Sequence, residues 1–298
     1  MADFSLQVQP VDAAEWLDTA RRAETAGFDT LLAADHPGSG AAPFVALAAA
    51  AAVTTRIKLG SYVSNAGVRE PILLAADVAT LDVVSGGRAR LGLGAGHTPA
   101  EWDAIGQVRP DVRGRVERCI AVAEATRRLL AGEEVTVATP ELTMLNAALT
   151  GPRPVQERIP LTMGTANSRL LSWAAEHADI VGLTGFGRTL ANGHHHEVRW
   201  RLADIDAQVA LAGAKPLEAL VQRVEVTDDA GAVLDELAGE LGLSVAELRE
   251  VPFVLVGTAD EIVEAVRGHR ERWGIGRYVV RRNALDQFAA LLPRLAEV

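Results

Sequence analysis

The sequence predicts a single (β/α)8 barrel, in which eight parallel strands, each followed by a helix, close into a cylinder. Short β-branched or apolar runs alternate with longer amphipathic stretches along the whole chain, which is the pattern of parallel α/β proteins. The length of 298 residues matches that of such a barrel. A doubly wound open sheet is the competing interpretation. At this length it would normally form two domains, and no linker or shift in composition divides the chain, so we expect one domain over 1–298.

Turn and capping residues place the boundaries of these elements. Pro10 ends the first strand, and Asp12 can cap the following helix, which Gly27 ends. Thr258, with Glu261 three residues later, forms a capping-box pattern before a late helix. The eight expected strand segments are 4–8, 30–33, 56–63, 88–93, 161–163, 179–183, 220–226 and 278–280, and a further apolar run lies at 252–256. The expected helices are 12–25, 43–53, one that opens at 70–71, 112–130, 167–177, 197–211, 230–249, 258–273 and 284–296.

Two irregular segments interrupt the alternation, at 133–157 and 185–199. We expect a short hairpin with a loop in the first of them. Both are predicted to form the rim or lid of a pocket at the C-terminal face of the barrel, because long loops in compact domains commonly have that role. Their apolar side chains, such as Leu142, Met144 and Phe186, indicate a fairly apolar organic substrate.

The composition argues against several classes of partner. There are 29 Lys and Arg residues against 39 Asp and Glu, a formal net charge of -10, so nucleic acids and anionic membranes are not expected to bind. The single cysteine, Cys119, rules out an internal disulfide and is expected to be buried. No signal-peptide pattern opens the sequence, and the longest apolar stretch, 44–53, is about half of a membrane span. We therefore expect a cytoplasmic protein.

Residues at the C-terminal ends of the strands are the candidates for chemistry, because barrel active sites lie there. Asp35 and His36 follow the second strand, and His36 either exchanges protons near neutral pH or is a surface histidine before a turn proline. The glycine run at 91–97 lets backbone approach a flat ligand, or only packs tightly at the rim. It is not a dinucleotide fingerprint, because the third glycine is missing. Arg281 and Arg282 either contact an anionic group or lie solvated at the rim.

Two further groups are candidate ligand sites. The run at 164–168 leads from a strand into a helix, where it can hold an anion such as a cofactor phosphate or simply cap the helix. His194, His195 and His196 suggest a metal site, but adjacent side chains on a helix diverge and no carboxylate stands at a ligand spacing. We expect no metal site.

Five motifs stand in order along nearly the whole chain. They are ETAGFD at 24–29 leading to Asp35-His36, TLD at 80–82 with SGGR at 85–88, LGLGAG at 91–96, ADIVG at 178–182 and VGT at 256–258. Together they resemble the luciferase-like monooxygenase superfamily, in particular its branch of oxidoreductases that depend on the deazaflavin coenzyme F420. Five ordered motifs are more specific than any one of them.

The resemblance implies a barrel that binds F420 or FMN at its C-terminal face, commonly as a homodimer, with a non-proline cis peptide at or next to Tyr62–Val63. His36 would lie beside the reacting carbon, and His97 would assist it or bind substrate. F420 enzymes often carry Trp or Glu at the position of His97, so the second proton-handling group is left open. The residues expected to contact the cofactor are Asp35, Tyr62, Val63, Ser64, Gly94, Ala95, Gly96, Gly164, Thr165, Ala166, Asn167 and Thr184.

The activity implied by the resemblance is hydride transfer between F420 and a small organic substrate, with His36 moving the accompanying proton. Two alternatives stay open. One is an FMN-dependent monooxygenase that receives reduced flavin from a partner flavin reductase. The other is a flavin-binding barrel that has lost turnover.

Overall fold

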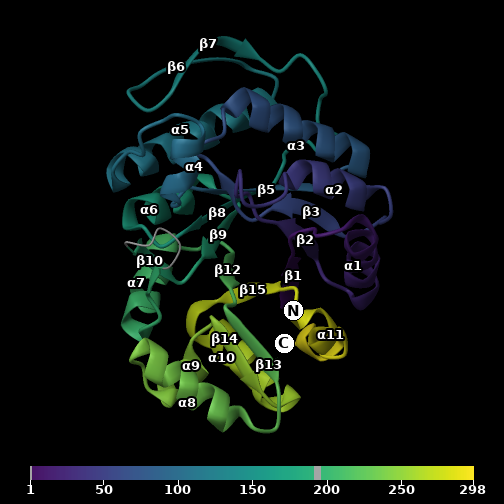
Figure 1. The fold of residues 1–298 in the computed structure, drawn as a ribbon, viewed down its shortest axis with the longest axis vertical. Helices are drawn as coiled ribbons and strands as arrows, with labels where there is room; N and C mark the ends of the chain where they lie inside the picture. Colours follow the sequence, from purple (N-terminus) through teal and green to yellow (C-terminus); the bar gives the residue numbers. More distant parts are fainter. Residues whose placement is uncertain (1, 191–195) are drawn as a thin grey trace.

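Eight parallel strands close into a barrel in the computed structural model, which describes residues 2–190 and 196–298 (Figure 1). The strands follow one another around the barrel in chain order, and the pairing of the last with the first, Tyr278 opposite Phe4, closes it. They are β1 (Asp3–Gln7), β2 (Thr30–Ala33), β3 (Lys58–Ser61), β5 (Ala89–Gly94), β8 (Leu161–Thr165), β9 (Ile180–Leu183), β12 (Leu217–Leu220) and β15 (Ile275–Arg281). The predicted (β/α)8 barrel is confirmed.

Helices cover the outside of the barrel (Figure 1). Those that connect the barrel strands include α1 (Ala13–Ala26), α2 (Pro43–Ala51), α3 (Pro71–Ser85), α5 (Val112–Leu130), α6 (Ser168–His177), α7 (Leu202–Ala212) and α10 (Ala259–Trp273). The predicted caps are present: Asp12 accepts a hydrogen bond from the Glu15 amide at 2.9 Å, and Gly27 ends α1 at a φ of 94°. Thr258 and Glu261 form the predicted capping box of α10.

The third barrel strand is interrupted where a cofactor contact was expected. A non-proline cis peptide joins Tyr62 to Val63, as predicted. The chain then resumes a short strand, β4 (Ser64–Asn65), which pairs with the C-terminal half of β5. The third strand is thus built from two pieces around a bulge.

One predicted barrel strand lies outside the barrel. The segment predicted at 220–226 contains the last residue of β12 and a separate strand, β13 (Arg223–Val226). β13 pairs in parallel with β14 (Val254–Gly257), which overlaps the apolar run at 252–256. The prediction that 220–226 is one barrel strand was wrong for β13, because a short apolar run has the same pattern in a barrel and in a two-stranded sheet beside it.

The long helix predicted at 230–249 is two helices. Gly242, at a φ of 63°, ends α8 (Ala230–Leu241), and Ser244 caps α9 (Val245–Glu250). Only glycine adopts that backbone conformation readily, so the helix stops there.

Other helix boundaries also differ from the prediction. The segment at 284–296 divides into α11 (Ala284–Ala289) and α12 (Leu292–Leu295), whose Pro293 cannot donate the backbone hydrogen bond of a continuous helix. The helix predicted from 197 begins only at Leu202, because residues before it form β11 (His196–Val198), which pairs with β10 (Phe186–Thr189).

The predicted hairpin within 133–157 is present as β6 (Glu134–Ala138) and β7 (Thr143–Ala148). It lies beyond α5 at the top of Figure 1. Among the described residues no helix is long and apolar enough to cross a membrane. Cys119 is fully buried on α5, as expected, and burial raises the pKa of its thiol to about 12.

A buried ion pair crosses the barrel interior. Arg90 on β5 donates to the carboxylate of Glu218 on β12, and both side chains are almost completely buried. The Arg90 guanidinium also donates to the Thr162 hydroxyl on β8, at 2.7 and 3.0 Å. These contacts tie three barrel strands together. The Arg90 charge depends on Glu218 because neither side chain reaches water, and Nε of Arg277 lies a further 3.9 Å from the Glu218 carboxylate.

Replacing Glu218 with alanine is expected to reduce the free energy of unfolding by about 3–5 kcal/mol, because Arg90 would remain charged and buried without its partner. Denaturant unfolding of both proteins measures this loss. Glu264→Ala is the matched control: Glu264 pairs with Arg267 on the exposed surface of α10, where removing a pair costs less than about 1 kcal/mol. Equal losses in the two variants would contradict the assignment.

Candidate active site

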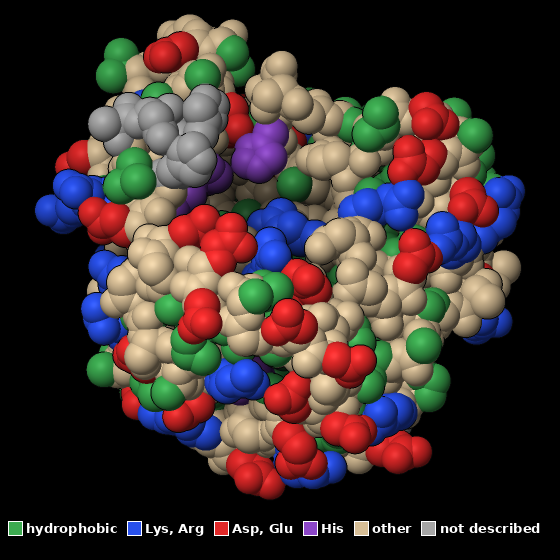
Figure 2. Space-filling model, turned by 60° about the horizontal axis from the view of Figure 1, so that its bottom comes forward, with side chains coloured by type: hydrophobic (Ala, Val, Ile, Leu, Met, Phe, Trp, Pro, Cys, Tyr) green, Lys and Arg blue, Asp and Glu red, His purple; other side chains and the backbone are tan. Residues whose placement is uncertain are grey.

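A cavity of about 950 Å³ opens at the C-terminal ends of the barrel strands. Figure 2 shows histidine side chains beside this hollow, with arginine or lysine side chains adjacent to it. Residues at or just after the ends of all eight strands line it: Gln7, Ala34, Asp35, His36, Tyr62, Val63, Asn65, Gly94, Ala95, Gly96, His97, Gly164, Thr165, Ala166, Asn167, Thr184, Leu220 and Arg281. The topology therefore gathers residues that are far apart in the chain.

Almost every predicted site residue lines this cavity. The exception is Ser64, which is completely buried and does not reach the cavity. The rim segment at 185–199 contributes lining residues from β10 and β11, whereas no described residue of 133–157 lines the cavity. His194 and His195 lie outside the described residues.

Glycines allow the bulged third strand to pack against its neighbours. A Cβ atom at Gly94 would lie 2.6 Å from Cγ2 of Val63, and one at Gly164 would lie 2.9 Å from Cγ1 of the same side chain. Side chains at either position would therefore collide with Val63. The two interpretations of the glycine run, packing and ligand access, describe the same wall: Val63 packs against glycines whose backbone lines the cavity.

Asp35 holds the segment that follows the bulge. Its carboxylate accepts two hydrogen bonds from the Arg69 guanidinium, at 2.8 and 3.0 Å, and one from the backbone amide of Asn65 at 3.1 Å. The carboxylate is thus engaged by protein groups. Asp35 positions Asn65 and the cavity wall.

His36 forms a hydrogen-bonded pair with Glu101, a residue that the sequence analysis missed. The Nδ1 atom of His36 lies 2.8 Å from Oε1 of Glu101, whose side chain is only 4% exposed. Asn65 donates to the other carboxylate oxygen. The hydrogen bond with Glu101 raises the pKa of His36, although burial opposes it. Glu101 lies on α4 (Pro99–Ala104), a helix too short to show a periodic pattern, and only Pro99 signals its start.

His97 has the opposite protonation behaviour. Its ring packs edge-on against His36 and His196, with centroids 5.8 and 4.4 Å apart. Burial lowers the pKa of His97, and together with the charges of His196 and His36 it brings this pKa to about 4. A neutral imidazole at physiological pH suits contact with a ligand and not donation of a proton.

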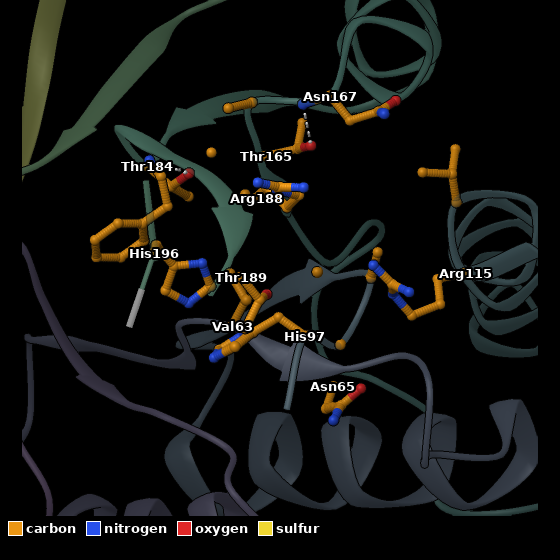
Figure 3. A pocket seen from close by; sticks show the side chains of 18 of the residues that line it. Val63, Asn65, His97, Arg115, Thr165, Asn167, Thr184, Arg188, Thr189 and His196 are labelled. Carbon is orange, nitrogen blue, oxygen red and sulfur yellow. Dashed lines mark hydrogen bonds between the residues drawn. The ribbon is translucent and has the colours of Figure 1, made fainter. Parts of the chain in front are cut away.

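Aromatic side chains from the β10–β11 hairpin complete this side of the cavity. His196 stacks on Phe186, with centroids 4.8 Å apart, and faces the cavity beside His97 (Figure 3). In the described part of the chain no group of three or more His, Cys, Asp and Glu side chains is placed to hold a metal ion.

Polar and basic side chains gather at the start of α6. Asn167 caps this helix, since its Oδ1 accepts from the Leu170 amide at 3.1 Å, and the Asn167 amide donates to the Thr165 hydroxyl at 2.9 Å. Arg188 and Arg115 also line the cavity (Figure 3). Capping is thus present. Of these two arginines, which the sequence analysis did not single out, Arg188 pairs with Glu197 at 2.9 Å, whereas Arg115 forms no ion pair with a described carboxylate.

Comparisons with known proteins agree with this architecture. A 4-hydroxyprotoasukamycin monooxygenase from Streptomyces nodosus subsp. asukaensis is 28% identical over 316 aligned positions, which cover 93% of this chain and 80% of that protein. A 5,10-methylenetetrahydromethanopterin reductase from Methanolobus tindarius is 29% identical over 245 positions, covering 82% of this chain and 68% of that protein.

The solved structure of a coenzyme F420 dependent tetrahydromethanopterin reductase from Methanopyrus kandleri superposes with a TM-score of 0.75 and 19% identity over 99% of both chains, which shows the shared fold. A family model described as luciferase-like monooxygenase matches residues 3–238. The chain belongs to the luciferase-like monooxygenase family, and its activity is that of an oxidoreductase.

Proposed function

We propose that this protein transfers a hydride between coenzyme F420 and a small organic substrate, with His36 moving the accompanying proton. The observation that carries the proposal is the His36–Glu101 pair on the wall of a cavity at the strand ends. Resemblance of the motifs to F420-dependent enzymes and similarity to a methylenetetrahydromethanopterin reductase support the choice of cofactor.

The residues of the cavity fit a tricyclic cofactor with a phosphate. The volume of about 950 Å³ lies near the upper end of the range for small-molecule sites, about 300–1,000 Å³, and leaves room for a substrate. Backbone at Gly94 and Gly164 offers a wall without side chains against which a flat ring can lie. Thr165, Arg115 and Arg188 would hold the phosphate.

Bound F420 supplies or accepts the hydride. His36 handles the proton: its Nδ1 is engaged by Glu101, so Nε2 is the ring atom left for a substrate oxygen. Because the Glu101 contact raises the pKa of His36, the imidazole holds a proton at higher pH than an ordinary histidine and is stabilised as a cation by the adjacent carboxylate. His97 stays neutral beside it and contacts the ligand.

An FMN-dependent monooxygenase is the second candidate function. The similarity to a Streptomyces monooxygenase over 93% of the chain favours it, and the aromatic wall around Phe186 is equally suited to an apolar substrate of such an enzyme. In this case reduced flavin would come from a partner reductase. A flavin-binding barrel without turnover is less favoured, because a proton-handling pair has no use there.

Titration with F420 and with FMN separates these candidates. Quenching of the intrinsic tryptophan fluorescence should report tight binding of F420 and much weaker binding of FMN. Trp102, which is fully buried next to Glu101, is the natural reporter. Tight binding of FMN without a response to F420, together with oxygen consumption when reduced FMN is supplied, would transfer the assignment to the monooxygenase.

Replacing Gly94 with alanine is expected to weaken F420 binding by about tenfold or more, because the new Cβ would stand 2.6 Å from Val63 and displace the cavity wall. The same fluorescence titration measures the change. Gly239→Ala is the control, since nothing lies within 4 Å of a Cβ at that position of α8. An unchanged affinity in Gly94→Ala, with an intact fold by circular dichroism, would refute the proposed role of this wall.

Replacing Glu101 with glutamine should lower the pH at which His36 titrates. In the unmodified protein the Glu101 contact raises the pKa of His36, so the imidazolium persists as pH rises above the usual histidine value and is lost at higher pH. Glutamine keeps an oxygen for Asn65 but removes the negative charge. NMR titration of the His36 ring measures the midpoint. Glu240→Gln, an exposed change on α8, should leave it in place. Equal midpoints in all three proteins would show that Glu101 does not control His36.

A further inference from the structure

Arg281 is an arginine of the cavity without a negative partner in the described part of the chain. Arg281 lies at the end of β15 and lines the cavity, yet it forms no ion pair with any described carboxylate. Its neighbour Arg282 pairs with Glu15, and Arg90, in the barrel interior, pairs with Glu218. Arg109 and Arg115, which also line the cavity, form no ion pair with a described carboxylate either.

The guanidinium of Arg281 is held in place by neutral groups. Nη1 donates to Oε1 of Gln7 at 3.0 Å, and Nη2 donates to Oε1 of Gln222 at 3.1 Å. A guanidinium has five N–H groups, so three remain. The side chain is exposed and lines the cavity, so the remaining donors are available to a ligand there.

The surroundings of Arg281 disfavour its charge. Burial by the protein around it lowers the pKa of Arg281, and no carboxylate offsets this effect, although the side chain keeps surface exposed. The charge is desolvated by the surrounding protein while the side chain stays exposed, which is consistent with its place on the cavity wall. A partly desolvated cation with unused donors is stabilised when an anion binds to it.

The position of Arg281 separates it from the basic residues at the expected phosphate site. Its charge acts on His36, whose pKa it lowers. Arg115 instead interacts with Arg109 and Asp111. Arg281 therefore belongs to the end of the cavity where the proton is moved.

Apolar side chains flank the same place. Leu220 and Tyr62 share a small buried cluster, and Phe186 packs against this cluster from the β10–β11 hairpin. Leu220 and Phe186 both line the cavity together with Arg281. A ligand here would contact the Arg281 guanidinium on one side and apolar side chains on the other.

We propose that the substrate is an organic anion with an apolar body, and that Arg281 binds its carboxylate or phosphate group beside His36. The inference rests on the proposed function and adds the class of substrate. Arg281 is a specificity-determining residue in this account: a neutral compound of the same shape leaves the guanidinium without its counter-charge.

Calorimetric titration with three compounds of similar shape tests the inference. Benzoate and phenyl phosphate carry the two candidate anionic groups, and benzamide is the neutral counterpart. Each is titrated into the protein with F420 and without it. We expect at least one anion to bind about tenfold or more tightly than benzamide, with the better anion identifying the group. Arg281→Gln should abolish this preference, Arg281→Lys should keep part of it, and the control Arg282→Gln should keep it fully.

Several outcomes would overturn the inference. These are equal binding of benzamide and both anions, an undiminished preference in Arg281→Gln, or no binding of any of the three with or without F420. A tenfold loss of F420 affinity in Arg281→Gln, with an unchanged fold by circular dichroism, would assign the guanidinium to the cofactor and also overturn it. If the unmodified protein prefers anions but does not bind F420, the proposed function fails and the anion site of Arg281 stands.

Discussion

The contact of Val63 with Gly94 on β5 and Gly164 on β8 is the constraint on which the cavity depends. The bulge at Tyr62–Val63 brings this side chain to where Cβ atoms at 94 and 164 would otherwise stand. Asp35 secures the chain directly after the bulge through its bonds to Arg69 and the Asn65 amide. Asn65 in turn donates to Glu101. Packing at the wall and placement of the His36–Glu101 pair are therefore parts of one connected structure.

Two arginines in the barrel show how the same side chain serves stability and binding. Arg90 lies where water does not reach, and Glu218 from β12 neutralises its charge while Thr162 from the neighbouring β8 accepts two of its hydrogen bonds. Arg281 lies at the mouth, is held by two glutamines and keeps donors free toward the cavity. A buried charge must be neutralised within the fold, whereas a charge at the mouth can be neutralised by a ligand.

The two histidines of the cavity illustrate how surroundings divide roles between identical side chains. A carboxylate raises the pKa of His36, and burial among other imidazoles lowers that of His97 to about 4. Oppositely shifted groups in one cavity are typical of sites that move protons. The His97 position, where the sequence departed from the pattern of F420 enzymes, is thus occupied by a neutral ring, and the acidic group comes from Glu101 on the next helix.

The sequence by itself determined the barrel, the caps of α1 and α10 and most of the residues that line the cavity, because alternation of strands and helices, capping and glycine patterns are local. Tertiary structure decided the rest. Glu101 meets His36 across 65 positions of sequence, and β14 pairs beside the barrel although its apolar run resembles a barrel strand. Whether Arg281 was paired or unpaired also depended on side chains of distant strands. Pairings of this kind arise only when the barrel closes, so no local pattern could reveal them.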